Sequence, residues 1–159
     1  MTKKEIKKSV EKNAKTLDKI VANIVNGYCK DLDACMEDIK ESLNKKPHTE
    51  KLERYCMELS THIYFASSMC ENLGIRDDIS KAVYKEAYHV NREEAKGTVE
   101  DKNSYAELRS QNEYVINVCY NRAYKILKAK VESAQEVLSS CKKIISRRMQ
   151  EYELTRLSQ

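Results

Sequence analysis

Residues 98–159, TVEDKNSYAELRSQNEYVINVCYNRAYKILKAKVESAQEVLSSCKKIISRRMQEYELTRLSQ, indicate the fold class more clearly than any other segment. These 62 residues contain neither glycine nor proline, the two residues that most often interrupt a helix. Their apolar side chains recur at helical spacing, and Thr98 with Asp101 resembles the capping box that starts a helix. The segment therefore predicts one very long C-terminal helix, or two helices separated by a subtle break.

The composition extends this helical interpretation to the whole chain. Its 159 residues are enough for one domain, and three glycines and one proline leave few positions for tight turns. So few turn residues argue against sandwiches and barrels, and against the glycine-rich phosphate loops of nucleotide enzymes. We expect an all-α protein in which residues 1–159 form a single helical bundle. Its long C-terminal amphipathic helix is expected to self-associate through coiled-coil-like packing.

The N-terminal segment, residues 1–46, carries one apolar stripe at spacings of mostly three and four. Asn26 and Gly27 interrupt this stripe, so the segment is either one helix with a weak point or two shorter helices. Pro47 ends it, because proline disfavours a helical conformation in the preceding residue.

Residues 47–97 are expected to form two helices. The first begins with Thr49 as N-cap and stops at Gly74. Its inward face comprises Leu52, Cys56, Leu59, Ile63, Ala66, Cys70 and Leu73.

The second of these two helices follows directly in the sequence. Asp77 or Asp78 can cap its start, and Gly97 closes it. Its inward face is expected to comprise Ile79, Val83, Ala87 and Val90.

The charge balance and hydropathy limit the partners of the chain. The formal net charge is +4, an excess too small to imply a polyanionic partner by itself. No apolar run approaches the roughly 18 residues of a membrane-spanning helix. The first residues lead into an amphipathic pattern, not into the apolar core of a signal peptide. We therefore expect a soluble, cytoplasmic protein with no membrane partner.

Catalytic and metal-binding motifs are scarce. The six cysteines are scattered and mostly fall on apolar helix faces, which favours buried free thiols over a disulfide scaffold. Glu86-x-x-His89 matches one half of a carboxylate-bridged di-iron site, but the second half is missing. No C-x-x-C pair, nucleophile motif or phosphate loop occurs. We expect no enzymatic activity, no metal and no cofactor.

A set of cationic residues with interleaved tyrosines lies on either side of Gly97, and we call it the basic row. On the helix before Gly97 its members recur at spacings of three and four, opposite Val83 and Val90. Cationic groups can track phosphates while a tyrosine ring stacks on an unpaired base. Free backbone N–H groups at the helix start near Thr98 would also suit an anion. The basic row comprises Lys81, Lys85, Tyr88, Arg92, Lys96, Lys102, Tyr105 and Arg109.

A solvated helix face is the alternative interpretation of the basic row. Glu93, Glu94, Glu100 and Asp101 occur in the same stretch and would repel phosphate. Acidic and basic side chains four residues apart also form ion pairs on ordinary helix surfaces. Pattern alone leaves both interpretations open.

The C-terminal helix is longer than the preceding helices can cover. Unbroken, it would extend roughly 90 Å at about 1.5 Å per residue. Its exposed apolar stripe would need a partner helix, so we expect a homo-oligomer. The residues expected at this contact are Ile126, Val137, Cys141, Ile144 and Met149. Cationic residues on the same helix either flank this contact or form a second nucleic-acid contact: Arg122, Lys125, Lys128, Lys130, Lys142, Lys143, Arg147 and Arg148.

Three motifs of the C-terminal half occur in one segment: YK at 84–85, KGTVEDK at 96–102 and KKIISRRM at 142–149. With them, the segment from Lys81 to Arg156 resembles the UvsY-type recombination mediators of tailed phages. The resemblance implies a small, non-enzymatic, ring-forming homo-oligomer that binds single-stranded DNA in the host cytoplasm. Members of this family displace single-strand-binding protein and help to load a RecA-like recombinase.

The resemblance also implies residue roles. Lys85 would match a basic DNA-contacting position, and the helix from about Ala123 onward would match the oligomerising segment. Ala87 stands where the family has an arginine, so Lys81 and Arg92 would supply the additional charge.

The alternative function is a helical protein–protein interaction module, such as a phage adaptor, scaffold or inhibitor, that binds no nucleic acid.

Overall fold

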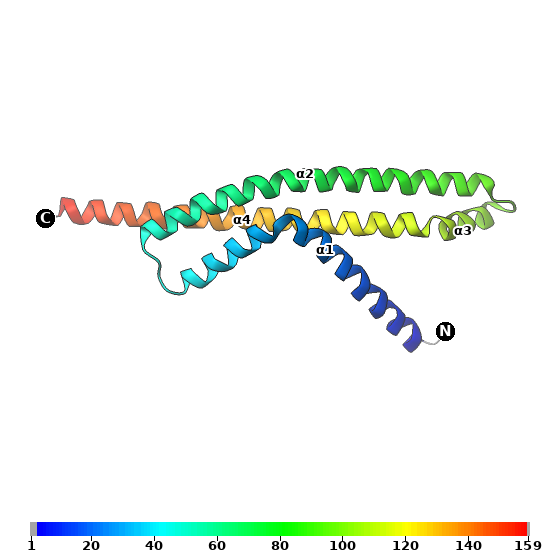
Figure 1. Ribbon diagram of the computed structural model, residues 1–159, viewed down its shortest axis with the longest axis horizontal. Coiled ribbons are helices and arrows are strands. Elements are labelled where there is room, and N and C mark those ends of the chain that lie inside the picture. The colour runs from blue at the N-terminus through cyan, green and yellow to red at the C-terminus, as the bar shows by residue number, and fades with distance from the viewer. Residues whose placement is uncertain (1–2, 159) are drawn as a thin grey trace. The chain divides into compact units, whose positions relative to one another are not determined.

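The computed structural model describes residues 3–158, with side chains described from Glu11 onward. This part of the chain folds into helices and contains no strand. The helices are α1 (Lys3–Leu43), α2 (Thr49–Glu94), α3 (Val99–Arg109) and α4 (Gln111–Leu157) (Figure 1). The structure confirms the expected all-α fold with a long C-terminal helix.

Helix α1 passes through Asn26 and Gly27 without a break, so the first segment is one helix. A Cβ atom at Gly27 would meet no other atom within 4 Å, and no close packing requires glycine there. The helix ends at Leu43, and three residues later Lys46 has a positive φ angle of 48°. This left-handed residue and the following Pro47 turn the chain toward α2.

The prediction of two helices within residues 47–97 is wrong, because α2 continues through Gly74 as far as Glu94. A Cβ at Gly74 would lie 3.3 Å from the Tyr124 ring, so the glycine gives room to a neighbouring aromatic side chain. One glycine costs only about 1 kcal/mol relative to alanine within a helix, which packing can offset. Asp77, one of the two expected N-caps, instead accepts a hydrogen bond from Asn121 Nδ2 at 2.9 Å.

A single residue, Ser110, separates α3 from α4. Its backbone N–H and its hydroxyl both donate to the carbonyl of Ala106, at 3.0 and 2.6 Å. Its own carbonyl accepts from the Tyr114 N–H at 3.0 Å. The sequence predicted either one very long helix or two helices separated by a subtle break, and the structure has the second form. The break at Ser110 involves neither glycine nor proline.

Two compact units make up the chain, and α1, α2 and α4 contribute to both. Unit 1 contains the residues up to Gly27 together with Cys70–Ile126. Unit 2 contains Tyr28–Met69 and the residues from Leu127 onward.

Unit 2 has an interior of aliphatic side chains and thiols. The inward face predicted for the first half of α2 is confirmed, with only Cys56 partly exposed, and its last two residues, Cys70 and Leu73, belong to unit 1. Burial of each large aliphatic side chain contributes about 1.5–3 kcal/mol. The buried side chains of unit 2 include Cys29, Leu32, Cys35, Ile39, Leu52, Tyr55, Leu59, Ile63, Ala66, Leu127, Val131, Ala134 and Cys141.

Unit 1 also buries apolar side chains, such as Val25, Leu73 and Ala123, but between residues 75 and 118 polar side chains occupy the contact between α2 and α4. The inward face predicted around Ile79, Val83 and Val90 is wrong, since these side chains are 58%, 48% and 49% exposed. Ser80, one residue from Ile79, is buried in their place. The other buried positions between residues 75 and 118 are small: Ala95, Ala106 and Ser110.

Candidate nucleic-acid interface

The polar contact between α2 and α4 sets the geometry of unit 1. Asn117 Nδ2 donates to Ser80 Oγ at 3.1 Å and to Asp77 Oδ1 at 3.3 Å. The Tyr84 and Tyr114 rings meet with their centroids 5.3 Å apart. Later residues of α2 therefore pair with earlier residues of α4, so the two helices run antiparallel and present two flanks.

One flank of this helix pair is polar and cationic. It forms a groove of about 630 Å³ in which Lys81 from α2 lies beside cations from α4. Within the described residues, none of the lysines and arginines of this groove forms an ion pair with a carboxylate. Their charge is therefore available to an anionic ligand. The groove is lined by Lys81, Tyr114, Asn117, Val118, Asn121, Arg122 and Lys125.

The α2 part of the basic row continues this cationic flank. At 100° per residue, Lys85, Tyr88 and Arg92 lie on the same side of α2 as Lys81. Lys85 and Arg92 are exposed, and Tyr88 is partly buried. Asn103 Oδ1 accepts hydrogen bonds from Arg92 Nε at 2.8 Å and from the Tyr88 hydroxyl at 3.4 Å. This amide orients Arg92 and Tyr88 while leaving the charge of the guanidinium uncompensated.

The remaining members of the basic row are less closely associated with the groove. Lys96 is exposed in the loop between α2 and α3, where Gly97 has a positive φ of 115°. Lys102 is partly buried on α3. The Arg109 guanidinium lies 5.4 Å from the centroid of the Tyr105 ring, a cation–π contact that covers one face of the ring. The structure thus brings Tyr105 and Arg109 together but records no contact between this pair and the groove.

The start of α3 was expected to offer free backbone N–H groups to an anion, and a capping box uses two of the N–H groups there. The Thr98 N–H donates to Asp101 Oδ2 at 3.0 Å, and the Asp101 N–H donates to Thr98 Oγ1 at 3.3 Å. The hydrogen bond from the Thr98 side chain, followed by that from its backbone, lowers the pKa of Asp101. The capping box that the sequence pattern indicated therefore satisfies the N–H groups of Thr98 and Asp101 and places a carboxylate at the start of α3.

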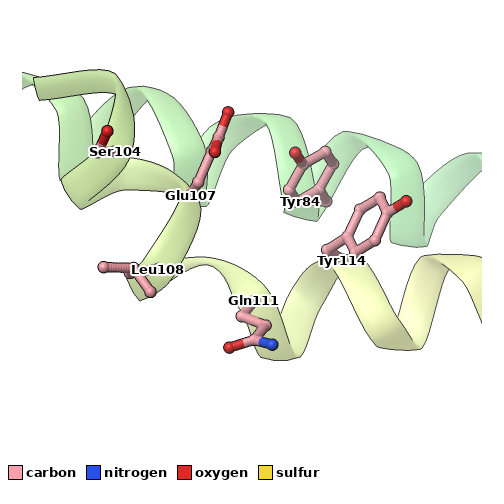
Figure 2. Close-up of a pocket in the computed structure, with 6 residues that line it drawn as sticks. All are labelled: Tyr84, Ser104, Glu107, Leu108, Gln111 and Tyr114. Carbon is pink, nitrogen blue, oxygen red and sulfur yellow. The ribbon is translucent and has the colours of Figure 1, made fainter. Parts of the chain in front are cut away.

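The structure adds aromatic residues that the sequence pattern did not assign to a site. Tyr84 and Tyr114 line a second pocket, of about 500 Å³, which shares Tyr114 with the cationic groove. Figure 2 shows the rings of Tyr84 and Tyr114 next to one another, with their hydroxyl groups pointing apart, and Glu107 extending from α3. Ser104, Glu107 and Gln111 supply polar groups around the rings. A flat ligand with hydrogen-bonding edges, such as a nucleobase, fits these chemical groups.

Of the residues expected at a self-association contact, one is buried and the others are at least partly exposed. Cys141 is buried in unit 2, where its thiol hydrogen-bonds with that of Cys56. Ile126, Ile144 and Met149 are exposed by 44%, 37% and 55%, and Val137 is partly exposed. Cys141 therefore belongs to the interior of its own chain, while the others remain accessible to a partner.

None of the six cysteines forms a disulfide in the described part of the chain, and five of them are buried, as the sequence predicted. Burial, and then hydrogen bonding to Asp33, raises the pKa of Cys29 to about 11. Burial likewise raises the pKa of Cys35, Cys119 and Cys141. These groups remain protonated at neutral pH, a form that is neither nucleophilic nor metal-binding.

Searches for related proteins and for other classes of site add no further assignment. No protein family model, curated protein or solved structure matches this chain. In the part of the chain that the structure describes, no group of three or more His, Cys, Asp or Glu side chains is placed to hold a metal ion. None of the described helices combines the length and the apolar character needed to cross a bilayer.

Proposed function

We propose that this protein binds single-stranded DNA through the cationic flank of unit 1 and has no catalytic activity of its own. The observation that carries the proposal is the groove in which Lys81, Arg122 and Lys125 lie together without carboxylate partners. Phosphates would follow these cations, because neutralising phosphates releases condensed counterions. Unpaired bases would stack on the tyrosines of the adjoining pocket.

The resemblance to UvsY-type mediators supports a more specific role for such a protein. We infer that it acts in the cytoplasm as a recombination accessory protein, displacing single-strand-binding protein and helping to load a RecA-like recombinase. Self-association would increase the affinity, since each added copy of the flank contributes another weak DNA contact.

The test is a fluorescence-anisotropy titration of a labelled single-stranded oligonucleotide at low and near-physiological salt. The variant is Lys81→Ala with Lys125→Ala, and the matched control is Lys30→Ala with Lys45→Ala, two exposed lysines of unit 2. We expect salt-sensitive binding by the wild type and the control. For the variant, loss of two phosphate contacts would lower the slope of log K against log salt by about 1.4.

Absence of binding even at low salt would refute the proposal. Equal affinity of the wild type and the Lys81 and Lys125 variant would remove the groove from the binding site. An RNA oligonucleotide of the same sequence tests the preference for DNA. If binding is seen, recombinase loading onto DNA coated with single-strand-binding protein tests the mediator role.

A protein–protein interaction module is the second candidate function, and the exposed apolar side chains of unit 1 favour it. Monomeric soluble proteins rarely expose large contiguous apolar patches unless these bind a partner. This function predicts no affinity for nucleic acid, so the same titration separates the two candidates.

A further inference from the structure

The second flank of the α2–α4 pair in unit 1 is apolar, in contrast to the cationic flank. It forms a groove of about 300 Å³ between the two helices. Ile79, Val83 and Ile116 line it with 58%, 48% and 51% of their surfaces exposed. Water therefore contacts large aliphatic side chains that a partner surface could bury at about 25 cal/mol per Å². The groove is lined by Arg76, Ile79, Ser80, Val83, Glu113, Ile116 and Tyr120.

Opposite charges mark the two ends of this apolar groove. Arg76 and Val83 are seven residues apart on α2, which places them about 10 Å apart along the helix axis. Because Tyr84 pairs with Tyr114 on the antiparallel helix, Glu113 lies at the Val83 end. The groove therefore has a cation at one end, a carboxylate at the other, and aliphatic side chains between them.

The Glu113 carboxylate lacks compensation within the described part of the chain. Its Oε2 atom is buried and has no hydrogen-bond partner there. Arg76 is exposed and belongs to none of the ion pairs formed by the described residues. A carboxylate that is partly withdrawn from water is stabilised when a guanidinium comes within hydrogen-bonding distance.

From this arrangement we propose that the apolar groove is a dimer interface, occupied by the same groove of a second copy of this chain. A twofold axis lying in the interface at right angles to the groove would exchange its two ends. Arg76 of each copy would then meet Glu113 of the other, with Ile79, Val83 and Ile116 packed between the two ion pairs. Such an isologous contact requires a self-complementary surface, and the reversed charge order provides one.

The charge order favours a second copy over an unrelated apolar partner. A twofold axis running along the groove would place Arg76 opposite Arg76 and Glu113 opposite Glu113, which repulsion disfavours. The contact also differs from the one expected on the C-terminal helix, because it uses unit 1 alone. It leaves the cationic flank of each copy uncovered and does not depend on whether that flank binds DNA.

Charge reversal gives the sharpest test, measured as sedimentation equilibrium of the full chain over a range of concentrations. We expect the wild type to form dimers or assemblies of dimers. Arg76→Glu alone and Glu113→Arg alone should each weaken dimer formation at least roughly tenfold, because each creates like-charge contacts. Combining both substitutions in one chain restores opposite charges across the interface and should restore the dimer.

The matched control is Arg54→Glu, which reverses an exposed charge on α2 in unit 2, outside the groove. It should associate like the wild type, and circular dichroism checks the helical content of each variant. A wild type that stays monomeric at high micromolar concentration overturns the proposal. So do single reversals that leave association unchanged, or a double reversal that associates no better than either single one.

Discussion

The two units use the same pair of helices in opposite ways. In unit 2, α2 and α4 meet through aliphatic side chains and thiols such as Leu59, Leu127 and Cys141, all buried. In unit 1, Leu73 and Ala123 are buried too, but farther from the unit boundary along each helix the two helices meet through Ser80 and Asn117. There Ile79, Val83 and Val90 are about half exposed. The part of this helix pair in unit 2 therefore has an apolar interior, whereas the part in unit 1 exposes two chemically distinct flanks.

This contrast has an energetic basis. Burying a large aliphatic side chain contributes about 1.5–3 kcal/mol, but an intramolecular hydrogen bond contributes only about 1 kcal/mol net. A helix contact built from hydrogen bonds is therefore weaker than one of the same length built from aliphatic residues. The gain is specificity, because Asn117 must find its acceptors and so fixes the register of α2 against α4.

The largest expected difference between the units is in their response to side-chain truncation. Leu59→Ala in unit 2 should lower the free energy of unfolding by about 2–5 kcal/mol, because Leu59 is only 1% exposed and its removal leaves a cavity. Val90→Ala in unit 1 should change it by less than about 0.5 kcal/mol. Urea denaturation followed by circular dichroism measures both. Similar losses for the two variants would contradict the outward position of Val90.

A smaller effect is expected from the polar contact of unit 1. Asn117→Ala removes the donor to Asp77 and Ser80, and should destabilise unit 1 by about 1–2 kcal/mol. Hydrogen–deuterium exchange should accelerate in α2 and α4 within unit 1 and stay unchanged in unit 2. Asn112→Ala, at an exposed position of α4, is the control. Uniform acceleration over both units would show that their stabilities are not separable.

The smallest expected effect is an alkaline weakening of unit 2. Lys130 Nζ lies 2.6 Å from Asp33 Oδ2. Burial is the largest single influence on the pKa of Lys130 and lowers it, but the hydrogen bond to Asp33 and the negative charges of Cys29 and Asp33 together raise this pKa overall. The pKa of Cys29, at about 11, is raised as well. Both protonated forms therefore stabilise the folded state, and this contribution is lost as the pH rises through the folded pKa values.

Asp33→Asn tests this pH dependence. Both partners of the ion pair are partly exposed, so the variant should be less stable than the wild type by less than about 1 kcal/mol at pH 8. The difference should shrink as the pH is raised toward 11, near the folded pKa of Cys29, in urea titrations at each pH. A difference that grows with pH would show that Asp33 destabilises the protonated forms of Lys130 and Cys29.

The sequence was informative where hydrophobicity dominates packing. The face from Leu52 to Leu73 was predicted correctly, because regular aliphatic spacing leaves one way to bury the helix. The same rule failed at Ile79 and Val83, since the residues that pair with α4 there are polar. Hydrophobic periodicity carries no information about which polar side chains meet across two helices.

The sequence predicted which residues of the candidate site share one helix face, but not which residues of a second helix lie beside them. Four members of the basic row lie on the side of α2 opposite Val83 and Val90, because that relation follows from helix geometry alone: Lys81, Lys85, Tyr88 and Arg92. Lys96 was expected on the same helix but follows its end at Glu94. The approach of Arg122 and Lys125 to Lys81 depends on the register between two helices about 40 residues apart in sequence. That register is set by Asn117 and Asn121, which a single sequence does not distinguish from ordinary surface residues.

The boundary between the two units falls within helices, not within loops. It crosses α1 at Gly27, α2 at Cys70 and α4 at Leu127. Neither unit is a continuous stretch of chain, so no single truncation or proteolytic cut would release one intact. In evolutionary terms, the two units cannot be exchanged separately as modules by joining gene segments and must be inherited together.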